Sequence, residues 1–181
     1  MEKIKSKLVL DKKGISQTIS RLCEEIVKRN KIGGLQDLVI IGIRTRGAHI
    51  AERIVKLLKT KYETDVLLGI LDITLYRDDL TTISAQPIVR STEITFDLTD
   101  KKVVLADDVL YTGRTIRAAM DALVDFGRPK NIQLAVLIDR GHRELPVQAD
   151  YTGKILPTKK KEIVEVRLSE TDGKDEVVLK T

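Results

Sequence analysis

The segment VVLADDVLYTGRTIRAAM, residues 103–120, contains an apolar strand, two carboxylates, a small-residue turn and the start of a helix in immediate succession. Thr112, Gly113 and Thr115 lie where this helix should begin. At such a position, free backbone N–H groups and side-chain hydroxyls can converge on a phosphate at the positive end of the helix. Gly113 lets the main chain approach a ligand closely because it has no side chain. The segment therefore predicts a phosphate-binding loop.

Two carboxylates precede this loop. Asp107 and Asp108 would repel a phosphate, so we expect them to accept hydrogen bonds from hydroxyl groups or to approach a divalent cation. A sugar that carries a phosphate has both features. The simpler alternative is that the acids solvate a strand end and that the threonines cap a helix. The Walker pattern and the dinucleotide pattern GxGxxG are both absent from the sequence, so the usual nucleotide loops do not compete.

Strands and helices alternate on both sides of the segment. Periodicity predicts strands over 38–43, 66–73, 103–106 and 132–138, and helices over 15–30, 47–58 and 114–126. This order is typical of an α/β fold with a mostly parallel sheet and helices on both faces. The end of the chain differs, because IVEVRL and EVVL flank the turn pair Asp172-Gly173 and predict a β-hairpin. A length of 181 residues favours one domain, residues 1–181.

Four strand exits carry dense charge. In an open parallel sheet, ligands bind at the carboxyl ends of the strands, where the loops into the helices meet. The search for a site therefore narrows to four stretches: IGIRTRG (41–47), LDITLYRDD (71–79), ADDVLYTGRT (106–115) and IDRGHRELP (138–146).

Composition excludes several classes of protein. The apolar stretches are far shorter than the ~18 residues that span a bilayer, and the start MEKIKSK leads into no secretory apolar region, so we expect a cytoplasmic protein. One cysteine and two histidines form no metal-binding pattern. The formal charge of +5 suits an anionic partner, either a phosphorylated metabolite or a nucleic acid. Aromatic residues make up only 3% of the chain, which argues against a stacking platform for single strands.

The run VVLADDVLYTGRT (103–115) resembles the signature of type I phosphoribosyltransferases, which use phosphoribosyl pyrophosphate (PRPP). The stretches IGIRTRG, LDITLYRDDL, DDVLYTGRTIRAAMDALVDFGRP and LIDRGHRELP, in this order, resemble the bacterial pyrimidine operon attenuation proteins that are also uracil phosphoribosyltransferases. The resemblance covers nearly the entire chain. It implies the type I phosphoribosyltransferase fold, with a flexible lid loop over the substrate.

The resemblance assigns a part of PRPP to each loop. It implies that Asp107 and Asp108 hold the ribose hydroxyls and that the nucleotide phosphate lies in the loop made of Val109, Leu110, Tyr111, Thr112, Gly113, Arg114 and Thr115. It places pyrophosphate in the loop made of Arg44, Thr45, Arg46 and Gly47. The residues support the second role independently, since two cations that flank a hydroxyl beside a glycine suit a dianionic group. We regard the two aspartates and the two arginines as catalytic.

The lid and the base-binding segment are implied in the same way. Arg77, Asp78 and Asp79 fall in the lid, and a polar loop of about 20 residues is typical of one. Ile138, Asp139 and Arg140 lie where the family recognises the pyrimidine, largely through main-chain groups. The segment LIDRGHRELP favours uracil over hypoxanthine or orotate, which the sugar-phosphate loop cannot distinguish because it does not contact the base.

The implied reaction converts uracil and PRPP to UMP and pyrophosphate. Mg²⁺ would arrive with PRPP rather than on direct protein ligands. Positive charge develops on the ribose as pyrophosphate leaves, so the protein would act mainly by positioning the reactants and by stabilising the leaving group with Arg44, Arg46 and backbone amides. We expect no covalent nucleophile.

The resemblance also implies a regulator that senses UMP or UTP and binds the leader mRNA of pyrimidine genes. RNA hairpins are recognised through shape, backbone contacts and exposed loop bases, so a basic face suffices. Candidate phosphate contacts are Arg21, Lys28, Arg29, Arg143 and Lys154. Glu24 and Gln148 weaken this face, because the family often has basic residues in both regions. The alternative is a phosphoribosyltransferase without RNA regulation. The family implies a homodimer or a higher homo-oligomer, and we expect no DNA or membrane partner.

Overall fold

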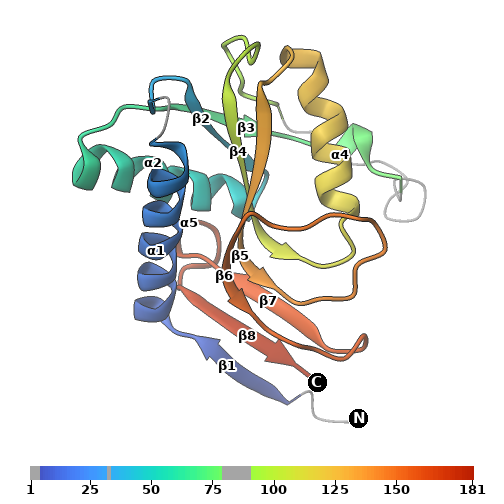
Figure 1. Ribbon diagram of the computed structural model, residues 1–181. Coiled ribbons are helices and arrows are strands. Elements are labelled where there is room, and N and C mark those ends of the chain that lie inside the picture. The colour runs from blue at the N-terminus through green and yellow to red at the C-terminus, as the bar shows by residue number, and fades with distance from the viewer. Residues whose placement is uncertain (1–4, 32–33, 79–90) are drawn as a thin grey trace.

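The computed structural model describes residues 5–31, 34–78 and 91–181, which form two β-sheets (Figure 1). The larger sheet has five parallel strands in the order β3-β2-β4-β5-β6. These strands are β2 (Leu38–Ile43), β3 (Leu67–Leu71), β4 (Lys102–Leu110), β5 (Asn131–Asp139) and β6 (Tyr151–Ile155). The structure confirms the predicted parallel α/β sheet.

Helices cover both faces of this sheet, as Figure 1 shows. On one face lie α1 (Lys12–Asn30) and α2 (Arg46–Tyr62), and on the other lie α4 (Arg114–Leu123) and the 3-10 turn η2 (Val124–Phe126). A second 3-10 turn, η1 (Thr74–Tyr76), follows β3. Side chains of a strand point alternately to opposite faces, so Leu38 and Ile40 pack with α1 and α2 while Val39 and Ile41 pack with α4. Because both faces of β2 are covered, residues 38–43 are apolar throughout.

The smaller sheet is antiparallel, in the order β1-β8-β7. Its strands are β1 (Ser6–Leu10), β7 (Ile163–Arg167) and β8 (Glu176–Lys180). β7 and β8 form the predicted hairpin, but the expected two-residue turn is wrong. The connection contains the short helix α5 (Ser169–Asp172), and Gly173 follows it with a φ of +73°. The positive φ favours glycine at this helix end.

Two strands were not predicted from the sequence, and one is longer than expected. β1 and β6 each have five residues, and neither shows a long apolar run. β4 continues beyond the predicted residues 103–106 to Leu110, because β5 continues to pair with it as far as Asp139. Asp107 and Asp108, which we call the acidic pair, therefore both lie within the strand, close to its carboxyl end.

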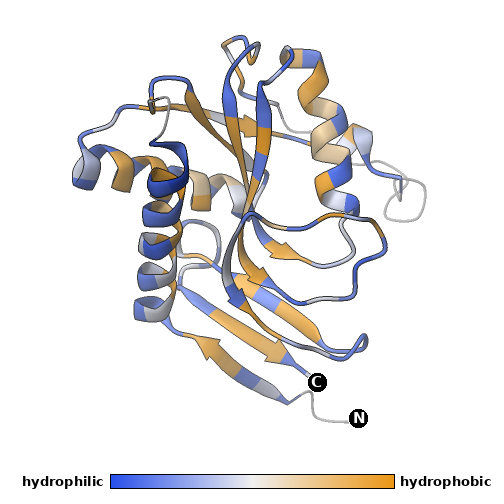
Figure 2. Ribbon diagram, in the orientation of Figure 1, coloured by the Kyte–Doolittle hydropathy of each residue, from blue (hydrophilic) through white to orange (hydrophobic). Residues whose placement is uncertain are grey.

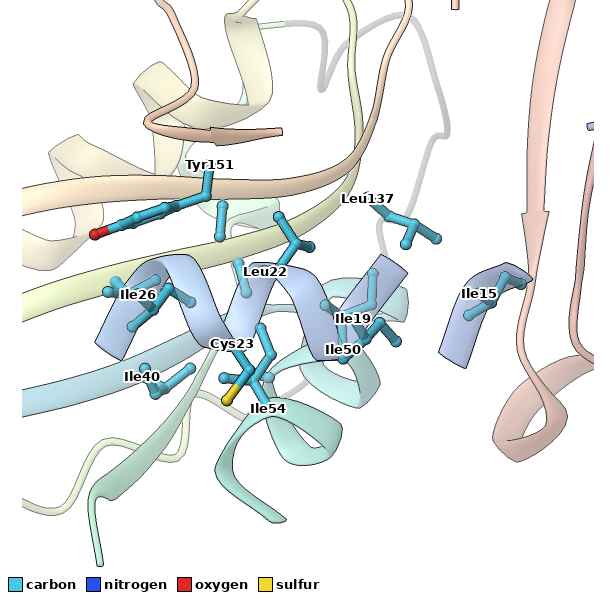
Figure 3. Close-up of a cluster of buried hydrophobic side chains, with 14 of the residues drawn as sticks. Ile15, Ile19, Leu22, Cys23, Ile26, Ile40, Ile50, Ile54, Leu137 and Tyr151 are labelled. Carbon is cyan, nitrogen blue, oxygen red and sulfur yellow. The ribbon is translucent and has the colours of Figure 1, made fainter. Parts of the chain in front are cut away.

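The helix α1 packs its apolar stripe into the core. Ile15, Ile19, Leu22 and Ile26 are at most 2% exposed. Figure 3 shows the last three among side chains from the sheet and from α2. Figure 2 shows the polar residues of α1 on its outer side. Cys23 lies in the same cluster, where burial raises the pKa of its thiol to about 11, so it fills the core as a neutral group. No helix in the described ranges combines the length and apolarity needed to span a membrane.

Candidate functional site

A cavity of about 260 Å³ opens where β2, β3 and β4 end, and we call it the strand-end cavity. It is lined by Ile43, Arg44, Thr45, Arg46, Asp72, Ile73, Thr74, Arg77, Asp107, Asp108, Val109 and Thr115. Three of the four predicted strand exits therefore meet at one place, as expected for an open parallel sheet. The structure brings together three groups: the acidic pair, the arginine loop (residues 44–47) and one end of the predicted phosphate loop (residues 109–115).

Two glycines allow close approaches at the arginine loop (Arg44, Thr45, Arg46 and Gly47), one against β4 and one between β2 and the start of α2. A Cβ atom on Gly47 would lie 2.5 Å from the carbonyl oxygen of Ala106 and 3.1 Å from Cα of Asp107. A Cβ atom on Gly42 would lie 2.5 Å from Cα of Ala48. Real Cβ atoms do not approach backbone so closely, so both positions require glycine for a close approach of two chain segments. The loop of Arg44 and Arg46 consequently begins α2 directly beside the acidic pair. The Arg44–Thr45 peptide bond is cis.

The acidic pair is held by its own backbone. The N–H of Asp108 donates to Oδ1 of Asp107 at 2.9 Å, and the N–H of Val109 donates to Oδ1 of Asp108 at 2.8 Å. Burial, followed by the charge of Asp108, raises the pKa of Asp107 well above its usual range. Burial also raises the pKa of Asp108, while Val109 and Arg46 oppose the rise. Asp107 and Asp108 both line the strand-end cavity, so both carboxylates can contact the same ligand.

The phosphate loop begins α4 as predicted. Gly113 is the residue before the helix and has a φ of +94°, which a side chain would strain. The carbonyl oxygen of Thr112 accepts the N–H groups of Glu144 and Leu145 at 2.9 and 3.2 Å. Of the predicted loop residues, only Val109 and Thr115 line the strand-end cavity, and the rest continue around the start of the helix. Arg114 is half exposed and pairs with Asp78 and Glu144 at 2.7 and 2.9 Å.

Both arginines of the loop predicted to bind pyrophosphate have partners within the chain. Arg44 donates from Nη2 to the carbonyl oxygen of Ser91 at 3.0 Å and to Glu93 at 2.6 Å, and its buried Nε makes no hydrogen bond. Arg46 donates to both carboxylate oxygens of Asp172, at 3.1 and 2.8 Å. These hydrogen bonds lower the pKa of Asp172. The two guanidinium groups are therefore fixed beside the cavity.

The predicted lid is described only in part. Arg77 lines the strand-end cavity, and Asp78 pairs with Arg114 and Arg117 at 2.7 and 3.6 Å. Asp79 lies outside the described residues, as does most of the predicted lid loop.

The side chains of the residues predicted to bind the base pack or form hydrogen bonds within the chain. Ile138 is completely buried in the core, and Asp139 accepts the N–H of Gly141 at 3.0 Å. Arg140 is 7% exposed, stacks over the ring of Tyr111 at 4.1 Å and donates to Thr158 at 3.2 Å. None of the three lines the strand-end cavity. Recognition of a base by main-chain groups of this segment stays a prediction.

Several cations of the predicted RNA face are engaged within the chain. Arg21 pairs with Glu25 and donates to carbonyl oxygens of β6, and Arg29 pairs with Asp150. Lys28 and Lys154 are exposed. Glu24, expected to weaken the face, forms an ion pair with Lys61 of α2 that offsets its charge.

Arg143, another predicted RNA contact, is bonded within the chain. Its guanidinium donates to three carbonyl oxygens, of Val147, Tyr111 and Gly141, and pairs with Asp139. Its side chain is 24% exposed. With these bonds Arg143 holds the loop after β5, and its role as an RNA contact stays a prediction.

Sequence reasoning missed two groups of residues at the site. Asp72, Ile73 and Thr74 line the strand-end cavity but were not singled out, although they lie in the quoted exit 71–79. Asp172 was read only as a turn residue, and its contact with Arg46 spans 126 positions of the sequence. Nothing in local periodicity signals such a pair.

A parallel sheet whose central strand ends in two neighbouring carboxylates, followed by a glycine turn and a helix, defines a phosphoribosyltransferase domain. The family described as the phosphoribosyl transferase domain matches residues 6–171. The hypoxanthine phosphoribosyltransferase of Trypanosoma cruzi, in a structure that covers 96% of this chain and 95% of its own, superimposes with a TM-score of 0.73 at 16% identity and shows the same fold.

Curated relatives narrow the assignment. The chain is 58% identical to the "Bifunctional protein PyrR" of Pelotomaculum thermopropionicum over 94% of this chain and 93% of the relative. It is 56% identical to the protein of the same name from Deinococcus radiodurans, over 94% and 92%. The protein of that name from Clostridioides difficile is 55% identical, over 95% and 96%. The chain belongs to the PyrR family of phosphoribosyltransferase-domain proteins.

Proposed function

We propose that the protein transfers the phosphoribosyl group of PRPP to uracil, giving UMP and pyrophosphate, and that it also binds the leader mRNA of pyrimidine genes under the control of uridine nucleotides. One observation carries the enzymatic part. The strand-end cavity joins two neighbouring carboxylates to two fixed guanidinium groups and to the start of α4. Hydroxyls, pyrophosphate and phosphate are the three kinds of group that PRPP presents, and each has a matching partner here.

The acidic pair suits ribose. Asp107 and Asp108 are held at their Oδ1 atoms by backbone N–H groups, so each carboxylate keeps acceptor capacity for a sugar hydroxyl. The raised pKa values of both carboxyls mean that their ionised forms are destabilised in the site. A positive charge close by would stabilise the ionised forms, and either a cation or the ribose, as its charge develops, would supply it. The described residues contain no cluster of three or more candidate metal-binding side chains, whereas two neighbouring carboxylates fit a cation that arrives on the substrate.

Catalysis would depend on position and charge. Mg²⁺ bound to PRPP would neutralise part of the pyrophosphate charge. Arg44 and Arg46 would stabilise the negative charge that grows on pyrophosphate as its bond to the ribose breaks. Backbone N–H groups at the start of α4 would fix the 5-phosphate, so that C1 of the ribose stays in line with the attacking uracil nitrogen.

The RNA-binding role rests on a shared basic face. Arg21 donates to the carbonyl oxygens of Thr152 and Gly153 in β6, so α1 and β6 are joined side by side. This contact places the exposed Lys28 and Lys154 on neighbouring elements. An RNA helix presents phosphates to such a surface, and ion pairs with them are salt-dependent.

We also propose that residues 1–181 act as one domain, in the cytoplasm, as a homodimer or a higher homo-oligomer. The support for one domain is packing. Val166, Leu168 and Val177 of the C-terminal hairpin belong to the same buried cluster as Ile15 of α1 and Ile50 of α2. Separate domains would not share one core.

Two assays test the proposal. Uracil-dependent release of pyrophosphate from PRPP should occur with the wild-type chain and should be lost in the double variant Asp107→Asn, Asp108→Asn while the fold survives. A titration of pyrimidine leader RNA should show binding that UMP strengthens and salt weakens steeply. Turnover without RNA binding would leave only the enzyme, and near-normal turnover in the double variant would refute the site.

A further inference from the structure

Two arginine contacts join α2 to α5. Arg46, the first residue of α2, donates from Nε and Nη2 to Asp172 at 3.1 and 2.8 Å. Two turns further along, Arg53 donates from Nε and Nη2 to Glu170 at 2.8 and 2.6 Å. The contacts have the same geometry and join the same two elements. They differ in two respects. Arg46 lines the strand-end cavity and Arg53 does not, and Arg53 also donates from Nη1 and Nη2 to Asp175 at 3.1 and 2.7 Å.

Asp172 is itself fixed. The backbone N–H of Leu168 donates to Oδ2 of Asp172 at 2.9 Å, and the N–H of Asp172 donates to the carbonyl oxygen of Leu168 at 2.7 Å. Leu168 is completely buried in the core. The carboxylate therefore has a defined position relative to the sheet, and it can orient a long, flexible arginine side chain through a planar pair of hydrogen bonds.

The pair leaves one end of the guanidinium for a ligand. Nε and Nη2 of Arg46 bind Asp172, and no hydrogen bond within the described part of the chain uses Nη1. Arg46 is also close enough to Asp108 for its charge to lower the pKa of that carboxyl. The arginine thus pairs with a structural carboxylate, Asp172, and lines the same cavity as a site carboxylate, Asp108.

We propose that Asp172 is a positioning residue for the transfer reaction, which fixes Arg46 so that its remaining nitrogen meets the pyrophosphate group of PRPP. The inference rests on the proposed function and adds to it a residue from the C-terminal hairpin. It has a selective consequence. Asp172 should matter for ligands that carry pyrophosphate, and not for UMP, whose single phosphate would lie at the start of α4.

The test compares Asp172→Asn with Glu170→Gln as a matched control. The control removes a charge from α5 and weakens the second contact, but it does not reach the cavity. For each variant we would measure the KM for PRPP and kcat, the inhibition constant of magnesium pyrophosphate, the dissociation constant of UMP, and the melting temperature. Asp172→Glu keeps the charge and displaces the guanidinium, and it replaces the asparagine variant if that variant does not fold.

We expect Asp172→Asn to raise the KM for PRPP and to weaken inhibition by pyrophosphate by at least about tenfold, the size of effect that a misplaced contact group produces. UMP binding should be unchanged, and Glu170→Gln should leave all the ligand constants unchanged. Unaltered pyrophosphate inhibition in Asp172→Asn, or equal losses for pyrophosphate and UMP, would overturn the inference. Failure of the wild-type chain to produce UMP would instead refute the proposed function.

Discussion

Replacing Gly47 by alanine tests how closely the arginine loop must approach β4. The new Cβ atom would lie 2.5 Å from the carbonyl oxygen of Ala106 and 3.1 Å from Cα of Asp107, and both contacts are backbone atoms that cannot rotate away. The start of α2 must therefore move away from the strand. Overpacking of this kind costs about 1–3 kcal/mol, and the better helix propensity of alanine offsets up to about 1 kcal/mol. We expect a net loss of unfolding free energy of about 0–3 kcal/mol.

Activity should suffer more than stability. A displacement of about 1 Å at a catalytic group can reduce the rate about 100-fold. Gly153→Ala is the matched control, because its Cβ atom would lie 2.3 Å from the carbonyl oxygen of Leu137 in a part of the sheet that does not line the strand-end cavity. Urea unfolding and steady-state kinetics with PRPP measure the two effects. The reasoning fails if Gly47→Ala keeps wild-type kcat/KM, or if both variants lose activity equally.

Three further predictions concern the acidic pair, the core and the RNA face. The pKa of Asp107 is raised in the folded state. Ionisation of this carboxyl therefore destabilises the fold increasingly as the pH rises from the unfolded pKa of ~3.9 through the folded value. Asp107→Asn should raise the melting temperature at neutral pH, and this gain should vanish near pH 4. A pH-independent gain would contradict this cause. The hydroxyl of Tyr151 donates to the buried Gln133, so Tyr151→Phe should lower the unfolding free energy by about 1–3 kcal/mol in urea titrations, whereas an unchanged midpoint would show that the polar network is unimportant. Lys28→Gln with Lys154→Gln should weaken leader RNA binding and reduce the slope of log K against log salt by about 1 for each phosphate that is no longer neutralised, and an unchanged slope would exclude both lysines.

Local patterns predicted most of the fold. The apolar run at 38–43 coincides with β2, and the stripe of Ile15, Ile19 and Leu22 is the buried face of α1. The helix starts earlier than predicted, at Lys12, because Asp11 accepts the N–H of Gly14 at 2.7 Å and caps it. β1 and β6 were missed because short strands owe their existence to partners that are distant in the sequence.

In the candidate site, too, features that are contiguous in the sequence could be predicted, and contacts between distant residues could not. The acidic pair and the turn at Gly113 could be predicted, because strand, loop and helix start are contiguous. The partners of the arginines could not, since Arg46 meets Asp172 only when the C-terminal hairpin packs against α2. Arg143 was assigned to RNA on charge alone, and the acceptors that surround it come from turns of the chain that no periodicity reveals.

The most direct measurement is a crystal structure of the protein with PRPP and Mg²⁺. We predict that the ribose hydroxyls lie within hydrogen-bonding distance of Asp107 and Asp108, with the 5-phosphate on the backbone N–H groups at the start of α4. Pyrophosphate should contact Arg46. A sugar phosphate bound elsewhere, such as in the cleft between α1 and α2 that Lys12 and Lys56 line, would contradict the account.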